Sequence, residues 1–494
     1  MGKLNLEKQK KTPYLSQYKK YLEGDYCVFD VPGHHQGGIH TDFDKVFTHI
    51  IYEKDINCPE GMDNLLHPHE CIKEAQELYA EATNADYAKF LVNGSTSGIL
   101  IMLNTVLKTN DKILLPRNVH KSVINALILC GAIPTFIMPE VDKETEIVNQ
   151  ISFDEWKNAI DNNLDAKAIF IINPTYFGAT CDLKKIVDYA HSKNIIVLVD
   201  EAHGTHFYFN NNLPMSAMEA GADMSTLSIH KTGGSLTQSS LLVVKGNRIN
   251  IKDVDDAFNM LTTTSPSNIL LASLDASRKF LVFKGQKEID KAINLCKKAT
   301  KLINKINGFK VLDTEYFKNN GAYDFDRTKL VIRLDKLSIS GFKVYKILQK
   351  QYHIQIELAE TNVLLCLFTI GSKDEDIKRL VKALKYISEK YYSKDKKEKI
   401  KTKFAFPPLK IRPRDAYQGK EKVVPFSNIE GEISKEMIMI YPPGIPIIIP
   451  GEVFTKDIIK QLEIYRNKKV NIISEYKNCD YISCVEVEDE KVNK

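Results

Sequence analysis

An acid and, further along the chain, a lysine are the residues best suited to chemistry. Asp200 ends the apolar run Ile195–Val199, and Lys231 follows Ser228 and His230 just before a pair of glycines. A buried parallel strand would deliver the Asp200 carboxylate to the carboxyl edge of a sheet, where open α/β sheets bind ligands. This order of groups is typical of a pyridoxal-phosphate (PLP) site. There the lysine forms a Schiff base with the cofactor, the acid keeps the pyridine nitrogen protonated, and the hydroxyl and imidazole bind the phosphate.

A small, hydroxyl-rich loop upstream could hold the phosphate group. Residues 93–98 (NGSTSG) follow an apolar run and precede a helical pattern. Free backbone N–H groups at a helix start favour a dianion, and the Ser95 and Thr96 hydroxyls would add donors. The same residue types also cap ordinary helices. The phosphate-binding interpretation is supported because the loop lies in the same alternating segment as Asp200 and Lys231.

Two further strand ends are expected at the same edge of the sheet. Residues 116–122 (PRNVHKS) follow one expected strand, and His120 is the candidate for a ring that stacks on the pyridine. Residues 172–178 (INPTYFG) end another, and Asn173 and Thr175 could reach the phenolic oxygen of the cofactor. A single loop histidine is more often a surface residue, so the argument depends on all four strand ends together.

Strand-like and helical patterns alternate from about residue 68 to 275, which predicts an α/β fold with a mostly parallel sheet. The charged run 394–403 is interpreted as a solvated linker. We therefore expect an N-terminal arm (1–30), a PLP-binding large domain (31–280), a smaller α/β domain (281–392) and a C-terminal domain (393–494). The main expected strands are 112–115, 135–138, 168–172, 195–199, 241–244, 329–334 and 363–369, and the expected helices include 99–107, 123–129 and 183–191.

Composition favours a soluble, cytoplasmic protein. The chain has 494 residues, too many for one compact core, and a net charge of +5 that does not indicate a nucleic-acid partner. We see no apolar run long enough to span a bilayer and no secretory signal at the N-terminus. The nine cysteines are scattered, as expected for reduced thiols.

Histidines that could suggest a metal occur in two places. They are His34, His35 and His40 in one segment, and His67 and His69 in another. Neither place shows a helical i, i+4 pair or an obvious third ligand, so no metal site is predicted.

The motifs as a set resemble the Orn/Lys/Arg decarboxylases, PLP-dependent enzymes of fold type I, the fold of aspartate aminotransferase. The resemblance extends over nearly the whole chain and is strongest to the short Gram-positive type of biosynthetic arginine decarboxylase. It implies a large domain with a mostly parallel sheet, a smaller α/β domain and a C-terminal decarboxylase domain. The matching segments are 31–38, 93–98, 116–122, 172–178, 199–204, 228–240, 260–275 and 441–452.

The resemblance also implies a role for each matching residue. Lys231 would bind PLP covalently, Asp200 would pair with the pyridinium nitrogen, and His120 would stack on the ring. Ala202 would pack beneath the cofactor, with His203 beside it. The phosphate would be bound by Ser95, Thr96, Ser228 and His230.

Two departures from the family pattern concern function. The family has Thr-Ser where this chain has Ser95-Thr96, which keeps both hydroxyls. Relatives usually have lysine where this chain has His35, so the fine specificity is open. The chain also lacks the receiver-like N-terminal domain of the long, acid-induced relatives, so their high-order assembly is not expected.

The implied activity is decarboxylation of a basic amino acid, first L-arginine to agmatine and CO2, in polyamine and spermidine biosynthesis. Lysine to cadaverine and ornithine to putrescine remain alternatives, because the acids that face the substrate cannot be identified. An aminotransferase would need an arginine in the small domain to hold the substrate carboxylate, and Arg333 is the candidate. Intact Lys231 and Asp200 argue against an inactive regulatory homologue. Lys231 or a nearby histidine would return the proton to Cα.

In this fold the cofactor pocket lies at a dimer interface, so we expect a homodimer or larger homo-oligomer with shared active sites. The polar run 262–265 (TTTS) could reach the phosphate of the partner subunit. The alternative is that it only caps a helix beginning near Asn268.

Overall fold

The computed structural model describes residues 4–24, 26–142, 144–145, 147–393, 406–440, 444–467 and 471–487. The expected linker 394–403 and residues 441–443 of the family-matching segment 441–452 lie outside the described residues. The chain forms two compact units, Met1–Thr105 with Ile196–Lys291, and Val106–Ile195 with Ala292–Lys494. The division into four domains stays a prediction. Across the described ranges, no helix is both long and apolar enough to cross a membrane.

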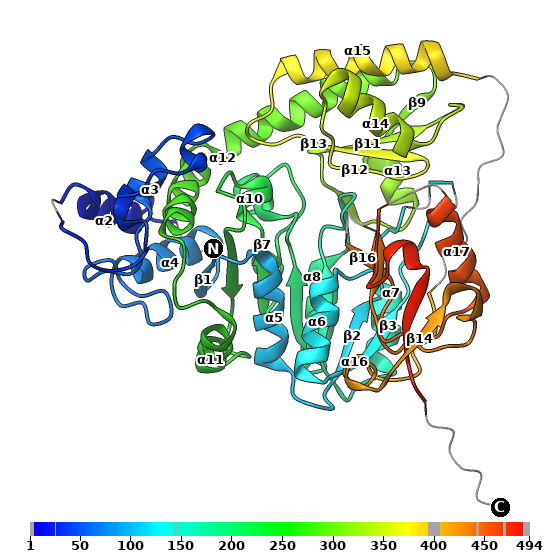
Figure 1. Cartoon of the computed structure of the whole chain (residues 1–494), viewed down its shortest axis with the longest axis horizontal. Coiled ribbons are helices and arrows are strands. Elements are labelled where there is room, and N and C mark those ends of the chain that lie inside the picture. Colours follow the sequence, from blue (N-terminus) through cyan, green and yellow to red (C-terminus); the bar gives the residue numbers. More distant parts are fainter. Residues whose placement is uncertain are drawn as a thin grey trace, which may run out of the picture. The chain divides into compact units, whose positions relative to one another are not determined.

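The first unit contains four strands of the large, mostly parallel sheet, in the order β1-β8-β7-β6 (Figure 1). Strands β6 and β7 are parallel, and their register pairs Asp200 with Thr226. Strand β8 runs antiparallel to both of its neighbours. The strands expected at 195–199 and 241–244 are confirmed, whereas β7 was not predicted because its sequence, MSTL, contains two hydroxyl side chains. The bounds are β1 Tyr87–Leu91, β6 Ile196–Asp200, β7 Met224–Leu227 and β8 Ser240–Val244.

Helix α5 (Gly94–Val106) follows β1 and approaches β7 closely. A Cβ atom added at Gly98 would lie 2.1 Å from the Thr226 hydroxyl oxygen, so only glycine fits at this point. The missing side chain therefore lets the first turn of α5 lie near the end of β7. Besides the N-terminal helices described next, this unit contains the α-helices α3 Ile50–Lys54, α4 Cys71–Ala82, α9 Ala217–Ala220, α10 Ile229–Thr232 and α11 Ile251–Leu261; α12, Asn268–Ile303, begins here.

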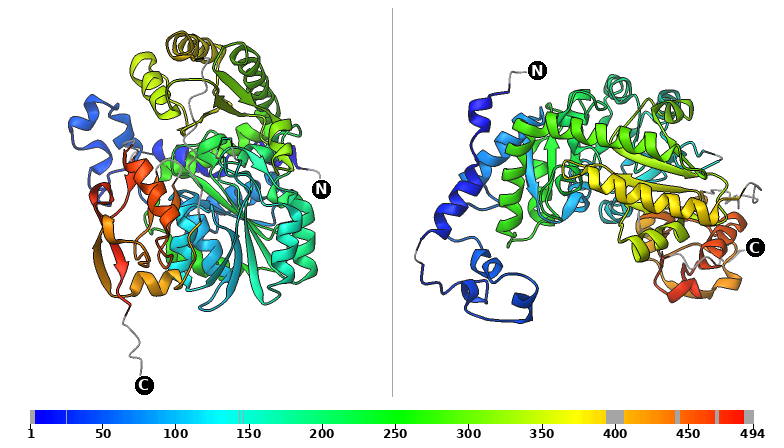
Figure 2. Two further views of the ribbon diagram at one scale, coloured as in Figure 1. Left: turned by 90° about the vertical axis from the view of Figure 1, so that its right-hand side faces the viewer. Right: turned by 90° about the horizontal axis from the view of Figure 1, so that it is seen from above.

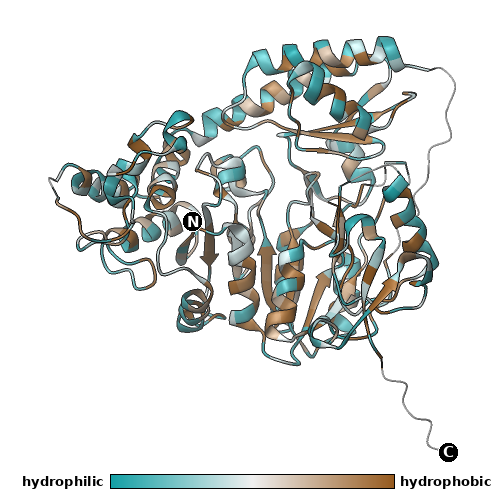
Figure 3. Cartoon of the chain, in the orientation of Figure 1, coloured by the Kyte–Doolittle hydropathy of each residue, from teal (hydrophilic) through white to brown (hydrophobic). Residues whose placement is uncertain are grey.

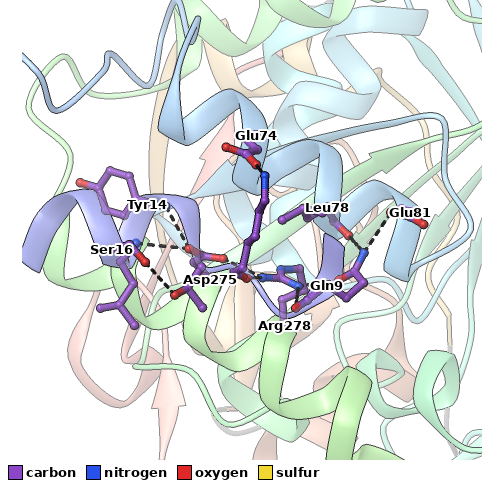
Figure 4. A network of polar contacts seen from close by, with 11 residues as sticks. Gln9, Tyr14, Ser16, Glu74, Leu78, Glu81, Asp275 and Arg278 are labelled. Carbon is purple, nitrogen blue, oxygen red and sulfur yellow. Dashed lines mark hydrogen bonds and ion pairs between the residues drawn. The ribbon is translucent and has the colours of Figure 1, made fainter. Parts of the chain in front are cut away.

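The N-terminal helices α1 (Leu6–Gln9) and α2 (Pro13–Leu22) are held by a buried polar network (Figure 4). The Arg278 guanidinium, fully buried on α12, donates to the Gln9 carbonyl (3.0 Å) and lies 3.2 Å from the Asp275 carboxylate. Asp275 in turn accepts a hydrogen bond from the Tyr14 N–H (3.0 Å). Because this carboxylate satisfies a free donor in the first turn of α2, it fixes the start of that helix.

The second unit contains strands β2 (Lys112–Pro116), β3 (Ile133–Ile137) and β4 (Ala166–Ile172), in the order β4-β2-β3. Strand β2 is parallel to both neighbours, as the alternating pattern predicted. The apolar sequences of the central strands appear in brown in Figure 3. The expected helices are confirmed as part of α6 Lys121–Cys130 and of α8 Leu183–Ser192, and α7 is Phe153–Asp161.

A four-stranded sheet in the order β12-β13-β11-β9 is also part of the second unit. Its apolar core is shared with the C-terminal part of α12 and with α14 and α15, which lie on it (Figures 1 and 2). Strands β11 and β13 confirm the predictions at 329–334 and 363–369. The bounds are β9 Phe309–Leu312, β11 Lys329–Leu334, β12 Leu358–Ala359, β13 Val363–Leu367, α13 Thr314–Asn319, α14 Gly341–Tyr352 and α15 Asp374–Tyr391; the short strands β5 Ala179–Thr180 and β10 Asp324–Phe325 pair with each other.

The C-terminal residues 406–487 have a small apolar core of their own. Two short antiparallel sheets, β14-β18 and β16-β15-β17, pack with helix α17. The bounds are α16 Pro413–Gln418, α17 Lys456–Asn467, β14 Glu421–Pro425, β15 Ile438–Ile440, β16 Ile445–Ile448, β17 Ile472–Ile473 and β18 Tyr481–Val485.

Candidate active site

The ends of the parallel strands β6 and β7 bring Lys231 close to His203. Lys231 lies on the short helix α10, which begins two residues after β7, and His203 lies in the turn that follows β6. The Lys231 ammonium nitrogen is 3.1 Å from the His203 Nε2 atom. The structure therefore places an amine within hydrogen-bonding distance of an imidazole at the carboxyl edge of the sheet, where ligands bind in such folds.

The Asp200 carboxylate, at the end of β6, is buried and hydrogen-bonded to its own turn. Its Oδ1 atom accepts from the Ala202 N–H (3.0 Å). Burial raises the pKa of Asp200, and the Ala202 hydrogen bond and the Lys231 ammonium both oppose this rise. A carboxylate that burial makes costly to ionise is stabilised in its charged form by a nearby cation. A protonated ring nitrogen would be such a cation.

Two hydroxyl groups meet at the start of α5. The Oγ atoms of Ser95 and Ser228 are 2.8 Å apart, although the residues belong to separate stretches of the chain. Gly94, just before them, has a φ of +69°, a left-handed conformation that glycine adopts without strain. The Thr96 side chain is partly exposed beside them. Backbone donors at a helix start together with paired hydroxyls suit a phosphate group.

His230 is held by the residue just before strand β8. Its Nδ1 atom donates a hydrogen bond to the Ser239 carbonyl oxygen (2.9 Å). Burial lowers the pKa of His230, and the Lys231 ammonium lowers it further. A bound phosphate dianion would oppose this effect, because it stabilises the protonated ring.

Three residues predicted for the site lie in the second unit. His120 is the N-cap of α6, and its Nδ1 atom accepts from the Ser122 N–H (3.3 Å), which fixes the ring. The Asn173 Oδ1 atom accepts from the Cys181 N–H (3.1 Å), whereas its buried Nδ2 group has no partner among the described residues. The Thr175 side-chain hydroxyl oxygen accepts a hydrogen bond from the Ala179 N–H (3.1 Å), which closes the loop between these two residues.

Sequence reasoning missed the buried residue next to Asp200. The Glu201 carboxylate accepts from the Ala217 N–H (2.8 Å) and from the Ser225 (2.7 Å) and Tyr208 hydroxyls. Burial is the largest influence on Glu201 and raises its pKa to about 7, although these donors lower it. The available signal was that Glu201 directly follows the strand-end acid Asp200. Because successive side chains of a strand face opposite sides, this position predicts that Glu201 points away from Asp200.

Arg117 and Glu452 form a second buried feature that the sequence did not reveal. The guanidinium of Arg117 donates through Nε and an Nη atom to both oxygens of Glu452 (2.6 and 2.7 Å). It also donates to the Pro446 carbonyl (3.1 Å), and both side chains of the ion pair are almost completely buried. The pair therefore joins the loop that carries His120 to the C-terminal residues.

Two groups of charged side chains bear on expectations from the sequence. Arg333 pairs with Glu144 (2.9 Å) and Asp335 (2.8 Å), so its guanidinium is already held by two carboxylates. The sequence showed no obvious third ligand near His40, but in the structure ligand atoms of His40, Asp44 and His49 lie within 4.8 Å of one another.

This group can be explained without a metal. His49 lies between two acceptors, the Gly37 carbonyl oxygen at Nε2 (2.9 Å) and the Asp44 carboxylate at Nδ1 (3.1 Å). A ring that donates to both is protonated, and the Asp44 hydrogen bond accordingly raises the pKa of His49.

Comparison with known families accounts for this combination of residues. The profile of the Orn/Lys/Arg decarboxylase major domain matches residues 12–376, and that of the C-terminal domain of the same family matches residues 394–471. The chain belongs to the Orn/Lys/Arg decarboxylase family. The resemblance inferred from the motifs is thereby confirmed.

Curated relatives and solved structures agree with this assignment. Arginine decarboxylase of Bacillus subtilis is 40% identical over 92% of this chain and 93% of its own length. Arginine decarboxylase of Bacillus anthracis is 41% identical over 91% and 92%. The lysine decarboxylase LdcF of Francisella novicida has a TM-score of 0.82 at 22% identity, covering 96% of this chain and 81% of that one. An alanine–glyoxylate aminotransferase from Nostoc has a TM-score of 0.53 at 14% identity, covering 64% and 86%. The predicted fold class is confirmed.

Proposed function

We propose that this decarboxylase acts on L-arginine, releasing CO2 and agmatine, with PLP as its cofactor. The observation that carries the proposal is the meeting of Lys231, His203 and the buried Asp200 at the ends of β6 and β7 in a member of this family. Relatives that are 40–41% identical over more than nine-tenths of the chain bear the name arginine decarboxylase, which favours arginine over lysine and ornithine.

The described residues fit PLP in their chemistry. The hydroxyls of Ser95, Thr96 and Ser228, the His230 ring and the start of α5 would hold the phosphate. The unpartnered Nδ2 group of Asn173 is a donor suited to the phenolic oxygen of the cofactor. By family resemblance, His120 would stack on the ring, with Ala202 beneath it. When bound, PLP would accept the electron pair left at Cα as the carboxylate departs.

The protein groups would then bind and move protons. An ionised Asp200 would hold a proton on the pyridine nitrogen, and its burial would make the attraction to that cation strong. Lys231 would hold the cofactor covalently through its side-chain amine. Because its nitrogen is 3.1 Å from His203, a proton can pass between the two side chains, and either could return the proton to Cα.

A product screen of purified, PLP-loaded protein tests the proposal. Arginine, lysine and ornithine are supplied separately, and agmatine, cadaverine, putrescine and CO2 are measured. We expect agmatine and CO2 from arginine, with the highest kcat/KM of the three substrates. Cadaverine or putrescine as the main product would replace the substrate assignment, and transfer of the amino group without CO2 would refute decarboxylation.

We further propose a homo-oligomer whose subunits share their active sites. Large apolar side chains are exposed in the segment 29–50, including Phe29 (91%) and Val46 (77%), which favours a covered surface in the assembly. Thr263 and Thr264 are also exposed. Sedimentation analysis should show at least a dimer. We also propose that the enzyme acts in the cytoplasm, in the synthesis of polyamines that include spermidine.

Mixing two inactive variants tests the shared site. Subunits with Lys231→Ala and subunits with Thr263→Ala and Thr264→Ala should regain activity together, because one composite site then receives both intact halves. An active monomer, or no recovery despite proven subunit exchange, would contradict the shared site.

A further inference from the structure

The second unit contains a cavity of about 100 Å³; Thr175 lies in its wall, but the space itself has no role in the proposed cofactor site. Loops that follow β2 and β4, the hairpin between β12 and β13, and the C-terminal residues all contribute to its wall. The side chains that decide its chemistry are Asn118, Tyr176, Glu360, Phe406, Gln461 and Tyr465.

Two amide oxygens in the wall lack a hydrogen-bond partner. In the described part of the chain, no donor reaches Asn118 Oδ1 or Gln461 Oε1, and both atoms are buried. The two side chains are only 6% and 4% exposed. Buried polar atoms in native proteins nearly always have a partner, so two such oxygens in one cavity indicate a ligand with N–H donors.

The rest of the wall indicates the shape and charge of that ligand. Phe406, Tyr176 and Tyr465 supply aromatic rings, and the Tyr176 hydroxyl donates to the Glu357 carboxylate, which orients its ring. Glu360 adds a carboxylate to the lining. A guanidinium group is flat, stacks on aromatic rings and directs five N–H donors outward in its plane. An ammonium group is compact and strongly hydrated, and it matches this wall less well.

The position of Asn118 connects the cavity to the proposed reaction. Its neighbour Arg117 is fixed by the buried ion pair with Glu452, and His120, two residues further on, is the side chain proposed to stack on the cofactor. We propose that the cavity binds the guanidinium group of arginine or agmatine, with Asn118 Oδ1 and Gln461 Oε1 as hydrogen-bond acceptors. This assignment rests on the proposed decarboxylase function and names the residues that select its substrate.

The test uses n-propylguanidine, which has the guanidinium group and a three-carbon chain but neither an α-amine nor a carboxylate. With PLP-loaded enzyme we expect it to inhibit arginine decarboxylation competitively. Gln461→Leu should raise its inhibition constant and the KM for arginine about tenfold or more, because a hydrogen bond to a charged group is lost. The kcat should stay within about twofold, since a distant head-group contact acts mainly on binding. Glu463→Gln, an exposed change on the same helix, is the matched control.

Gln461→Glu separates the chemistry of the side chain from its packing. It keeps an acceptor oxygen and adds charge, so it should retain the binding of n-propylguanidine that the leucine variant loses. This variant and direct calorimetry on the wild type keep the test valid if Gln461→Leu fails to fold. Equal constants for Gln461→Leu and the control, or no binding of n-propylguanidine, would overturn the assignment.

The two proposals fail in different ways. An enzyme that releases CO2 from arginine but does not bind n-propylguanidine leaves the function standing and removes the cavity from it. An enzyme that decarboxylates no basic amino acid refutes the function. Calorimetry then decides separately whether the cavity takes a guanidinium group.

Discussion

Replacing Arg117 by methionine tests how strongly the ion pair with Glu452 stabilises the protein. Both side chains are almost fully buried, and two hydrogen bonds of 2.6 and 2.7 Å join them. Methionine fills much of the space but leaves the carboxylate without its cation. Breaking a buried pair in this way costs about 3–5 kcal/mol. With an unfolding entropy of about 2.1 cal/mol/K per residue, a loss of about 4 kcal/mol lowers the melting temperature of a 494-residue chain by about 4 °C.

The assay is thermal unfolding followed by circular dichroism at pH 7, with two further variants. Arg117→Met combined with Glu452→Leu should recover most of the loss, because neither charge is then left alone. Arg412→Met breaks a half-exposed pair with Asp415 and should cost about 1 kcal/mol or less. Burial already raises the pKa of Glu452, so the single variant should recover stability as the pH falls. Equal melting temperatures for Arg117→Met and Arg412→Met would refute the reasoning.

Three further predictions concern the first unit. Lys231→Ala should lose the visible absorbance of the lysine-bound cofactor together with turnover, and unchanged absorbance would remove Lys231 from its role. Asp200→Asn should keep the fold and bind PLP but reduce kcat about 100-fold or more, because a neutral amide cannot hold the ring nitrogen protonated; near-normal kcat would contradict this. Burial raises the pKa of Glu201 from 4.5 to about 7, so the native state holds this proton more tightly than the unfolded state. Its stability contribution is complete below about pH 4.5 and falls by about 3 kcal/mol as the pH rises through 7. Glu201→Gln should lack this fall, whereas the exposed change Glu219→Gln should retain it; identical pH profiles for the two variants would disprove the origin of the effect.

The parts of the site that were predictable from sequence are those encoded within a few residues. Asp200 follows a run of buried β-branched residues, and Lys231 follows a serine and a histidine, so each pattern identifies itself locally. Strands β6 and β8 were found in the same way from their apolar runs. The direction of β8 was not predictable, because it is buried on both faces and its continuous apolar run is the kind found in parallel strands.

The residues that sequence reasoning missed depend on contacts between distant parts of the chain. Arg117 and Glu452 are separated by 335 positions, and no local pattern distinguishes them from surface charges. Gln461 shows the same difficulty, because its burial depends on segments packed around α17 rather than on its own helix. His49 was overlooked because its partners Asp44 and Gly37 precede it in an irregular segment.

The polar network of Figure 4 has a consequence for protein synthesis. Gln9 and Tyr14 are synthesised before their partners Arg278 and Asp275, which follow 269 and 261 positions later. At a translation rate of about 5–20 residues per second, the residues that pack against α1 and α2 are synthesised roughly 15 to 50 s after these two helices. During that interval the tyrosines of α2 are exposed in the nascent chain. Chaperones that cover α1 and α2 during this interval should therefore change the yield of folded protein.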